Sequence, residues 1–123
     1  MQKDDVIAVC NEEDIAQLDK KAGNFHDAVI ERWTFEGNTV YVKFDGIWNC
    51  KIELWFSGEV SCSVCALTPE GIAYDWFGSS MFFENGFLYF NSERGSTAKT
   101  IENACCWFKA RNLHYRVISD AQK

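Results

Sequence analysis

The chain has 123 residues, of which 47% are hydrophobic and 15% aromatic, with 12 Lys and Arg against 18 Asp and Glu. This length predicts one domain, residues 1–123, and the hydrophobic content excludes a disordered chain. The net charge of -6 disfavours binding to nucleic acid or to an anionic membrane and favours a basic or neutral partner.

A helix is predicted over residues 12–22. Asn11 is a residue type that caps helix N-termini, and the acidic residues that follow it suit the positive end of the helix dipole. Lysines fall in the last turn, and Gly23 follows as a C-terminal stop. Residues 6–9 are compatible both with an extension of this helix and with a short separate element.

An antiparallel β region is predicted from about residue 25 to residue 118, because the apolar period there changes to two. Two stretches alternate most clearly, as half-buried strands do. They are Val40, Val42 and Phe44 against Tyr41 and Lys43, and Cys50, Ile52, Leu54 and Phe56 against Lys51, Glu53 and Trp55.

Turns between the strands are predicted at short glycine-containing segments. They are residues 36–38, 45–46, 57–58 and 69–71. The strongest is Asn85-Gly86, which lies between two apolar runs and predicts a hairpin with a type I′ turn.

The segment 98–111 fits two interpretations. An apolar set at helical spacing begins at Ile101, whereas the apolar residues between 106 and 110 alternate as in a strand. The strand is preferred, with a bulge near Arg111 absorbing a change of phase. About seven or eight strands after one helix predict an α+β fold that is mainly β, with a curved antiparallel sheet in a partly open barrel or a sandwich.

Six cysteines raise the question of a metal or redox site. The polar N-terminus and the absence of an apolar run of roughly 20 residues predict a cytoplasmic location with free thiols. Cys62 and Cys65 form a C-x-x-C pair, but they lack a second ligand pair and would point to opposite faces of a strand. Cys105 and Cys106 are adjacent and alternate in the same way. We expect core thiols and assign no metal, although a composite site of these cysteines with His114 stays geometrically open.

No catalytic constellation is recognisable in the residue pattern. His26 and Asp27 are a base and a carboxylate, but adjacent side chains diverge in an extended segment, which favours a structural role where helix and sheet meet. The sequence has neither a G-x-S-x-G motif nor a phosphate-binding glycine loop. A non-enzymatic function without a cofactor is therefore expected.

The aromatic content is the most unusual feature of the composition. Trp55 and Trp107 are both out of phase with the apolar residues beside them, so both are expected on the second face of the sheet, and His114 falls in the polar phase of the last strand. Two alternatives are open. Either the helix or closure of the sheet covers this face, or these residues form an exposed binding surface for a partner or a ligand.

The order of features resembles that of small uncharacterised bacterial domains that open with a short acidic helix and a Phe-His-Asp motif. Here the motif is Phe25-His26-Asp27, followed by the Asn85-Gly86 hairpin and the segment 108–116. Some domains with this opening are labelled immunity proteins against bacterial toxins, and most have no assigned activity. The resemblance implies a domain of this kind and supports a strand at the C-terminal end.

The expected function is that of a protein-binding domain whose acidic surface complements a basic protein partner, as an immunity-type protein would. The alternative is a domain that binds a small molecule or a metal in an aromatic-lined pocket, with Cys or His as polar contacts. The sequence leaves the oligomeric state open.

Overall fold

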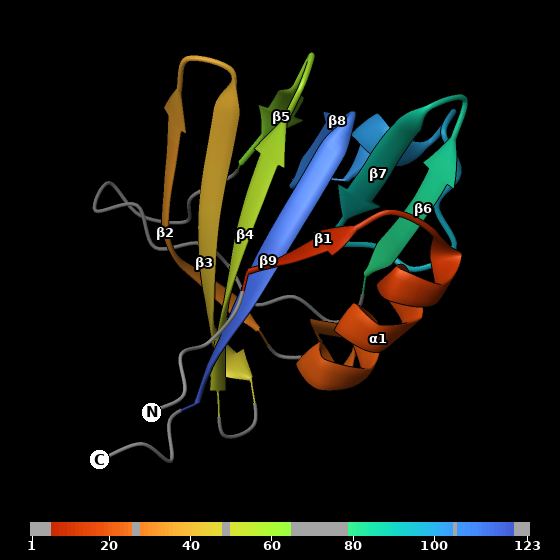
Figure 1. Ribbon diagram of the computed structural model, residues 1–123. Coiled ribbons are helices and arrows are strands. Elements are labelled where there is room, and N and C mark those ends of the chain that lie inside the picture. The colour runs from red at the N-terminus through yellow and green to blue at the C-terminus, as the bar shows by residue number, and fades with distance from the viewer. Residues whose placement is uncertain (1–5, 26–27, 48–49, 65–78, 105, 120–123) are drawn as a thin grey trace.

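The computed structural model of the protein describes residues 6–25, 28–47, 50–64, 79–104 and 106–119 (Figure 1). In chain order the elements are β1 (Ile7–Val9), α1 (Glu12–Ala22), the 3-10 helix η1 (Gly23–Phe25), β2 (Val29–Glu36), β3 (Thr39–Ile47), β4 (Cys50–Ser57), β5 (Ser61–Ser63), β6 (Ser80–Glu84), β7 (Phe87–Asn91), the 3-10 helix η2 (Ile101–Asn103), β8 (Trp107–Ala110) and β9 (Asn112–Ser119). The prediction of a mainly β protein with one α-helix is confirmed. None of the helices in these ranges is long and apolar enough to span a membrane.

The helix α1 occupies the residues predicted from the sequence, and both predicted caps are present. The side chain of Asn11 accepts a hydrogen bond of 2.9 Å from the backbone N–H of Asp14, whose carboxylate accepts one from Cys10. Gly23 ends the helix in the left-handed conformation, and its N–H donates to the carbonyl of Asp19. Local residue choice therefore determines both ends of α1.

The strands form two antiparallel sheets that do not close into a barrel. Sheet A has five strands in the order β1-β9-β4-β3-β2, and sheet B has four in the order β5-β8-β7-β6. Residues 7–9, which were compatible with a helix extension or a separate element, form the edge strand β1 and pair with β9. Within the described ranges, all strands except β1 follow the helix, as predicted.

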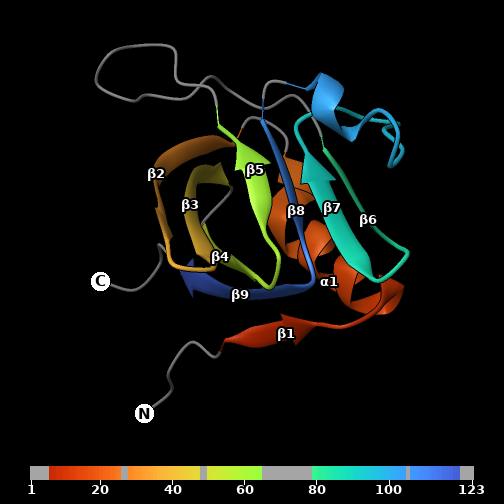
Figure 2. The same ribbon diagram turned by 90° about the horizontal axis from the view of Figure 1, so that it is seen from above.

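The two sheets are joined at one corner, where β4 leads into β5 and β8 leads into β9. Residues 58–60, between β4 and β5, face residues 110–111, where β8 meets β9. The first segment has one residue more than the second, which is a β-bulge. Gly58 has φ +83°, and its carbonyl accepts a 2.9 Å hydrogen bond from the N–H of Arg111. The bulge bends both strands, and Figure 2 shows the two sheets curving around a shared interior.

The interior between the sheets is filled by phenylalanine rings around Phe90. Its ring centroid lies 5.0 Å from that of Phe25, 6.2 Å from Phe44, 6.1 Å from Phe56 and 5.9 Å from Phe108. These residues come from η1, from sheet A and from sheet B, and the apolar side of α1 belongs to the same buried cluster. One hydrophobic core therefore holds the helix and both sheets together.

The predicted turns have different outcomes. Asn85 and Gly86 connect β6 to β7 with φ +55° and +83°, as a type I′ turn requires, and residues 37–38 connect β2 to β3. The turn predicted at residues 45–46 is wrong, because these residues lie within β3, where the register shifts. Glycine occurs at bulges as well as in turns, which explains the error at Gly46. Residues 69–71 lie outside the described residues.

The segment 98–111 divides into two parts. Residues 107–110 form β8, so the strand interpretation is confirmed there, and the predicted change of phase falls at Arg111, in the corner. Residues 101–103 instead form the 3-10 helix η2.

Candidate functional site

Sheet A has a core face and an outer face, and the centre of the outer face carries two cross-strand rows. Tyr41, Trp55 and His114 are paired across β3, β4 and β9, and Glu53 and Arg116 are paired in the next row. The sequence neighbours of these residues lie on the core face, where α1 also packs, and all are buried except Val117, which is half-buried. We call Tyr41, Glu53, Trp55, His114 and Arg116 the outer-face patch.

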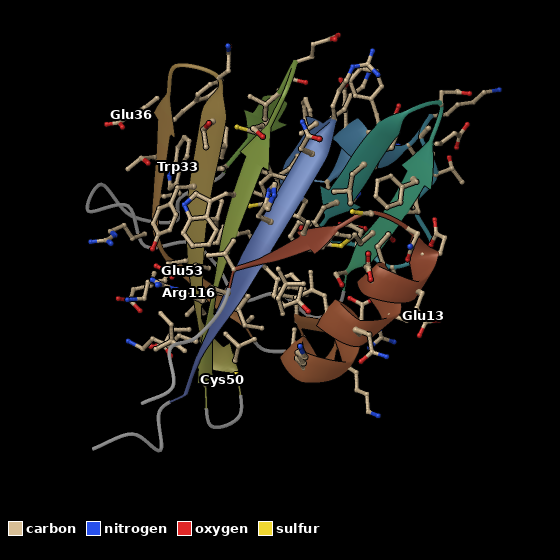
Figure 3. The ribbon with its side chains drawn as sticks, in the orientation of Figure 1. Glu13, Trp33, Glu36, Cys50, Glu53 and Arg116 are labelled. Atoms are coloured by element: carbon tan, nitrogen blue, oxygen red, sulfur yellow. The ribbon has the colours of Figure 1, made fainter. Side chains whose placement is uncertain are left out.

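Glu53 is the buried centre of the patch, with only 6% of its surface exposed. One carboxylate oxygen accepts a 2.6 Å hydrogen bond from the hydroxyl of Tyr41, and the other lies 2.7 Å from Nε and 2.5 Å from Nη2 of Arg116. Figure 3 shows Glu53 and Arg116 side by side on neighbouring strands. A buried carboxylate needs such partners on both oxygens, and the same bonds hold Tyr41 and Arg116 in place.

The aromatic rings of the patch are flanked by two guanidinium groups. The rings of Tyr41 and Trp55 lie 5.6 Å apart between centroids and are tilted by 47°. Cζ of Arg116 lies 5.9 Å from the ring centroid of Trp55, and Cζ of Arg32, from β2, lies 5.6 Å from that of Tyr41. These distances are in the range of cation–π contacts.

The pKa of Tyr41 is raised, first by partial burial and then by its hydrogen bond to Glu53, while Arg32 opposes the rise. The phenol is therefore a neutral hydrogen-bond donor over the physiological pH range. This state matches its observed role as a donor to the Glu53 carboxylate.

One end of the patch is bordered by charged side chains from β2, β3 and β4 that pair with one another. Glu31 lies 3.0 Å from Nζ of Lys51 and 3.8 Å from Nζ of Lys43, and Lys51 also lies 3.8 Å from Asp45. Ion pairs this exposed contribute about 0–1 kcal/mol each. They give this border a mixed and solvated charge rather than a concentrated field of one sign.

The chemistry of the patch suits recognition. The carboxylate of Glu53 is engaged on both oxygens, and the groups that face outward are aromatic rings and guanidinium N–H donors. Rings and guanidinium groups bind by stacking, hydrogen bonding and cation–π contact, and Tyr, Trp and Arg dominate the binding energy of protein interfaces.

The structure brings together two of the three residues predicted as a binding surface. Trp55 and His114 are direct cross-strand partners on sheet A and are both half-buried. Trp107 lies on β8 of sheet B, beyond the corner, where it pairs with β5 and β7. α1 packs with β1, η1 and β6 and buries its apolar side in the core, so it does not cover Trp55.

The Phe-His-Asp motif is described only at its first residue. Phe25 is fully buried, with φ +58°, and its ring centroid lies 5.0 Å from those of Phe44 and Phe90. Its role is packing at the end of η1. His26 and Asp27 lie outside the described residues.

The cysteines show no metal site in the part of the chain that is described. Cys106 is buried, and Cys62 is half-buried against the core, where burial raises the pKa of its thiol. His114 lies on the outer face instead, away from the core side that Cys62 contacts. Cys65 and Cys105 fall outside the described residues, and the described ones contain no group of three or more His, Cys, Asp or Glu suited to a metal ion.

Sequence reasoning missed most of the patch. Alternation already placed Tyr41, Glu53 and Trp55 on the polar side of their strands. What alternation lacks is the register between strands, which pairs Glu53 with Arg116 across β4 and β9, 63 residues apart in the chain. The opposite charges of Glu53 and Arg116 were the signal in the sequence that could have indicated this pairing.

Comparison with known proteins gives no family assignment. No protein family model, no curated protein and no solved structure matches the chain. The resemblance to Phe-His-Asp domains stays a prediction, and the functional argument depends on the geometry of the chain's own residues.

Proposed function

We propose that the protein is a non-enzymatic binding domain that recognises another protein through the outer-face patch. The observation that supports this is the joint placement of Tyr41, Trp55 and Arg116 on one sheet face, around the buried carboxylate of Glu53. Side chains that are already held in place lose little conformational freedom when a partner docks, so more of the contact energy contributes to affinity.

The proposed partner carries basic residues. The net charge of -6 attracts such a protein over long distances and raises its association rate. At close range the aromatic rings of the patch supply the contacts, and the charge of Arg116 is compensated by its ion pair with Glu53. An immunity-type protein, which neutralises a basic toxin by binding it, is one form of this function. It agrees with the resemblance carried by Phe25, His26 and Asp27.

The test compares two tryptophan variants of the immobilised protein in a lysate of the source organism. Trp55→Ala removes the ring that lies between Tyr41 and His114 in the patch, and Trp107→Ala removes a half-buried tryptophan from the other sheet. We expect the captured protein to bind Trp55→Ala about 30-fold more weakly or worse, as for a central interface residue, and to bind Trp107→Ala normally. Circular dichroism verifies that both variants are folded.

Two results would contradict the proposal. One is capture that is equally strong with Trp55→Ala, and the other is the failure of the wild-type protein to retain any protein at low salt. Stopped-flow association across a salt series then tests the charge of the partner. The rate should fall steeply as salt increases if the partner is basic, and a flat profile would exclude that part of the proposal.

A further inference from the structure

Among the described strands, β2 is the last strand on one side of sheet A, and it carries exposed aromatic rings. Among the described strands it pairs only with β3, and Figure 1 shows it on the side of the molecule away from α1. Trp33 is 38% exposed and Phe35 48% exposed, although their partners on β3, Val42 and Val40, are fully buried. A long apolar edge strand of this kind is a template for pairing with another strand.

The alternation of hydrogen-bonded and non-bonded pairs in the β2–β3 hairpin determines which backbone groups of β2 face the open edge. Residues 37–38 form the turn, and Glu36 pairs with Thr39 at its base. In a hairpin with a two-residue turn, the pair at the base exchanges both backbone hydrogen bonds, and bonded and non-bonded pairs alternate from there. By this rule Thr34 directs its backbone N–H and C=O towards β3, and Trp33 and Phe35 direct theirs towards the open edge.

In an antiparallel strand added at this edge, the residues opposite Trp33 and Phe35 must be those whose backbone N–H and C=O groups point towards β2. A second copy of β2 can do so with Trp33 opposite Trp33, with Trp33 opposite Phe35, or with Phe35 opposite Phe35. Only the second register also places Arg32 opposite Glu36 of the other copy, because the first places Arg32 opposite Thr34 and the third places Glu36 opposite Thr34. In the second register Thr34 lies opposite itself, on the two-fold axis.

This register satisfies three requirements at once. It joins the open backbone groups, it pairs an aromatic residue with an aromatic residue twice, and it pairs opposite charges twice on the other face of the sheet. Arg32 and Glu36 are both exposed, and Arg32 also contacts the ring of Tyr41 in its own copy. Figure 3 shows Trp33 and Glu36 on β2, the last described strand on this side of sheet A. A strand that complements itself in this way closes into a two-fold dimer rather than an open chain.

We propose that two copies of the protein associate through antiparallel pairing of their β2 strands, with Trp33 opposite Phe35 and Arg32 opposite Glu36 of the second copy. The pairing joins two five-stranded sheets into one continuous sheet. It also places two outer-face patches on one surface, which makes the dimer a bivalent binder. The proposal does not depend on the proposed function, although one of its residues, Arg32, also flanks the ring of Tyr41 in the outer-face patch.

The test uses charge reversal and sedimentation velocity on the purified protein alone, so that its outcome does not involve any partner. Arg32→Glu leaves acidic side chains at both 32 and 36, and Glu36→Arg leaves basic side chains at both positions. Each variant alone should dimerise about tenfold more weakly or worse than the wild type, because like charges then face each other twice. An equimolar mixture of the two variants should regain the dimer, because opposite charges face each other again.

The matched control is Glu84→Arg, which makes the same charge change at an exposed residue immediately before the Asn85-Gly86 turn of the other sheet. It should dimerise like the wild type, and circular dichroism verifies the fold of every variant. A wild-type protein that stays monomeric at the highest attainable concentration would overturn the proposal. So would a dimer that neither charge reversal weakens, or a mixture that does not regain it.

A cysteine at the two-fold axis gives a second readout that does not depend on weakening the dimer. In a Cys10→Ser background, which removes an exposed native thiol, Thr34→Cys should form a disulfide between two copies under mild oxidation. Glu36→Cys should not, because its counterpart in the second copy faces Arg32. Equal crosslinking of both variants would exclude this register.

Discussion

The half-buried carboxyl of Asp19 is expected to destabilise the protein at neutral pH. Asp19 lies on α1 next to the fully buried Leu18, and its Oδ1 is buried with no hydrogen-bond partner among the described residues. Desolvation by this burial raises the pKa of the carboxyl from 3.8 to about 6. The folded protein therefore favours the neutral acid, whereas the unfolded chain releases the proton at a lower pH.

The size and sign of the effect follow from this difference. A rise in pKa from 3.8 to about 6 corresponds to about 3 kcal/mol, and solvent screening of a half-buried group reduces it to about 1–2 kcal/mol. Because the folded pKa is above the unfolded one, the folded state binds the proton more tightly. The contribution to stability is complete below pH 3.8 and is lost as the pH rises through about 6.

The variant Asp19→Asn removes the charge without changing the size of the side chain. We expect it to raise the free energy of unfolding by about 1–2 kcal/mol at pH 7.5 and to change it little at pH 4. Urea unfolding followed by tryptophan fluorescence at both pH values measures this difference, and the titration of other groups cancels between variant and wild type.

The control is Glu13→Gln, on the exposed first turn of the same helix (Figure 3). Asp19 lies towards the other end of α1. It should lower stability at pH 7.5 by about 0.3–1 kcal/mol, because a helix N-terminus favours negative charge. A gain from Asp19→Asn that is the same at both pH values, or a loss at pH 7.5, would refute the reasoning.

Three further outcomes are expected. Phe90→Ala should lower the free energy of unfolding by about 3–5 kcal/mol in urea denaturation, since this fully buried ring contacts four others, and a loss below about 1 kcal/mol would contradict its central place in the core. Gly58→Ala should cost about 1–3 kcal/mol, because φ is +83° and the new Cβ would lie 3.0 Å from Cβ of Arg111, which the backbone holds in place. Gly37→Ala, with φ +60° and open space, should cost less in the same assay, and equal losses would exclude the steric part of the argument. Burial raises the pKa of the Cys62 thiol, so iodoacetamide should label Cys62 more slowly than an exposed cysteine in the folded protein at pH 8. Peptide mass spectrometry measures the two labelling rates, and equal rates would contradict this burial.

The parts of the fold that local chemistry determines could be predicted from the sequence. The helix needs only its own residues, so Asn11 and Gly23 locate both of its ends. The Asn85-Gly86 hairpin also needs only its own residues, because both turn positions adopt positive φ at little cost there. Alternation identified the core sides of β3 and β4 for the same reason, since each strand contains its own pattern.

The parts that depend on distant pairing could not be predicted. Residues 7–9 form a strand only because β9 offers an edge for them, and that edge is more than 100 residues away in the chain. The outer-face patch depends in the same way on the register of β3, β4 and β9, which no single strand contains. Trp55 and His114 could each be placed on the second face from their own strands, but their direct pairing with each other and with Tyr41 could not be assigned.

The exposure of Trp33 and Phe35 follows from how far the core extends under sheet A. On β4 the core-side residues Ile52, Leu54 and Phe56 are fully buried, and burial persists at the start of β2, where Ile30 is 4% exposed. Burial ends along β2 towards the turn at residues 37–38. The alternating apolar pattern of β2 therefore continues beyond the part of the strand that the core covers. The described residues leave both rings partly exposed at the edge of sheet A, where such rings suit contact with a partner strand. The self-complementary spacing of Arg32 and Glu36 on the opposite face of the same strand provides one in a second copy.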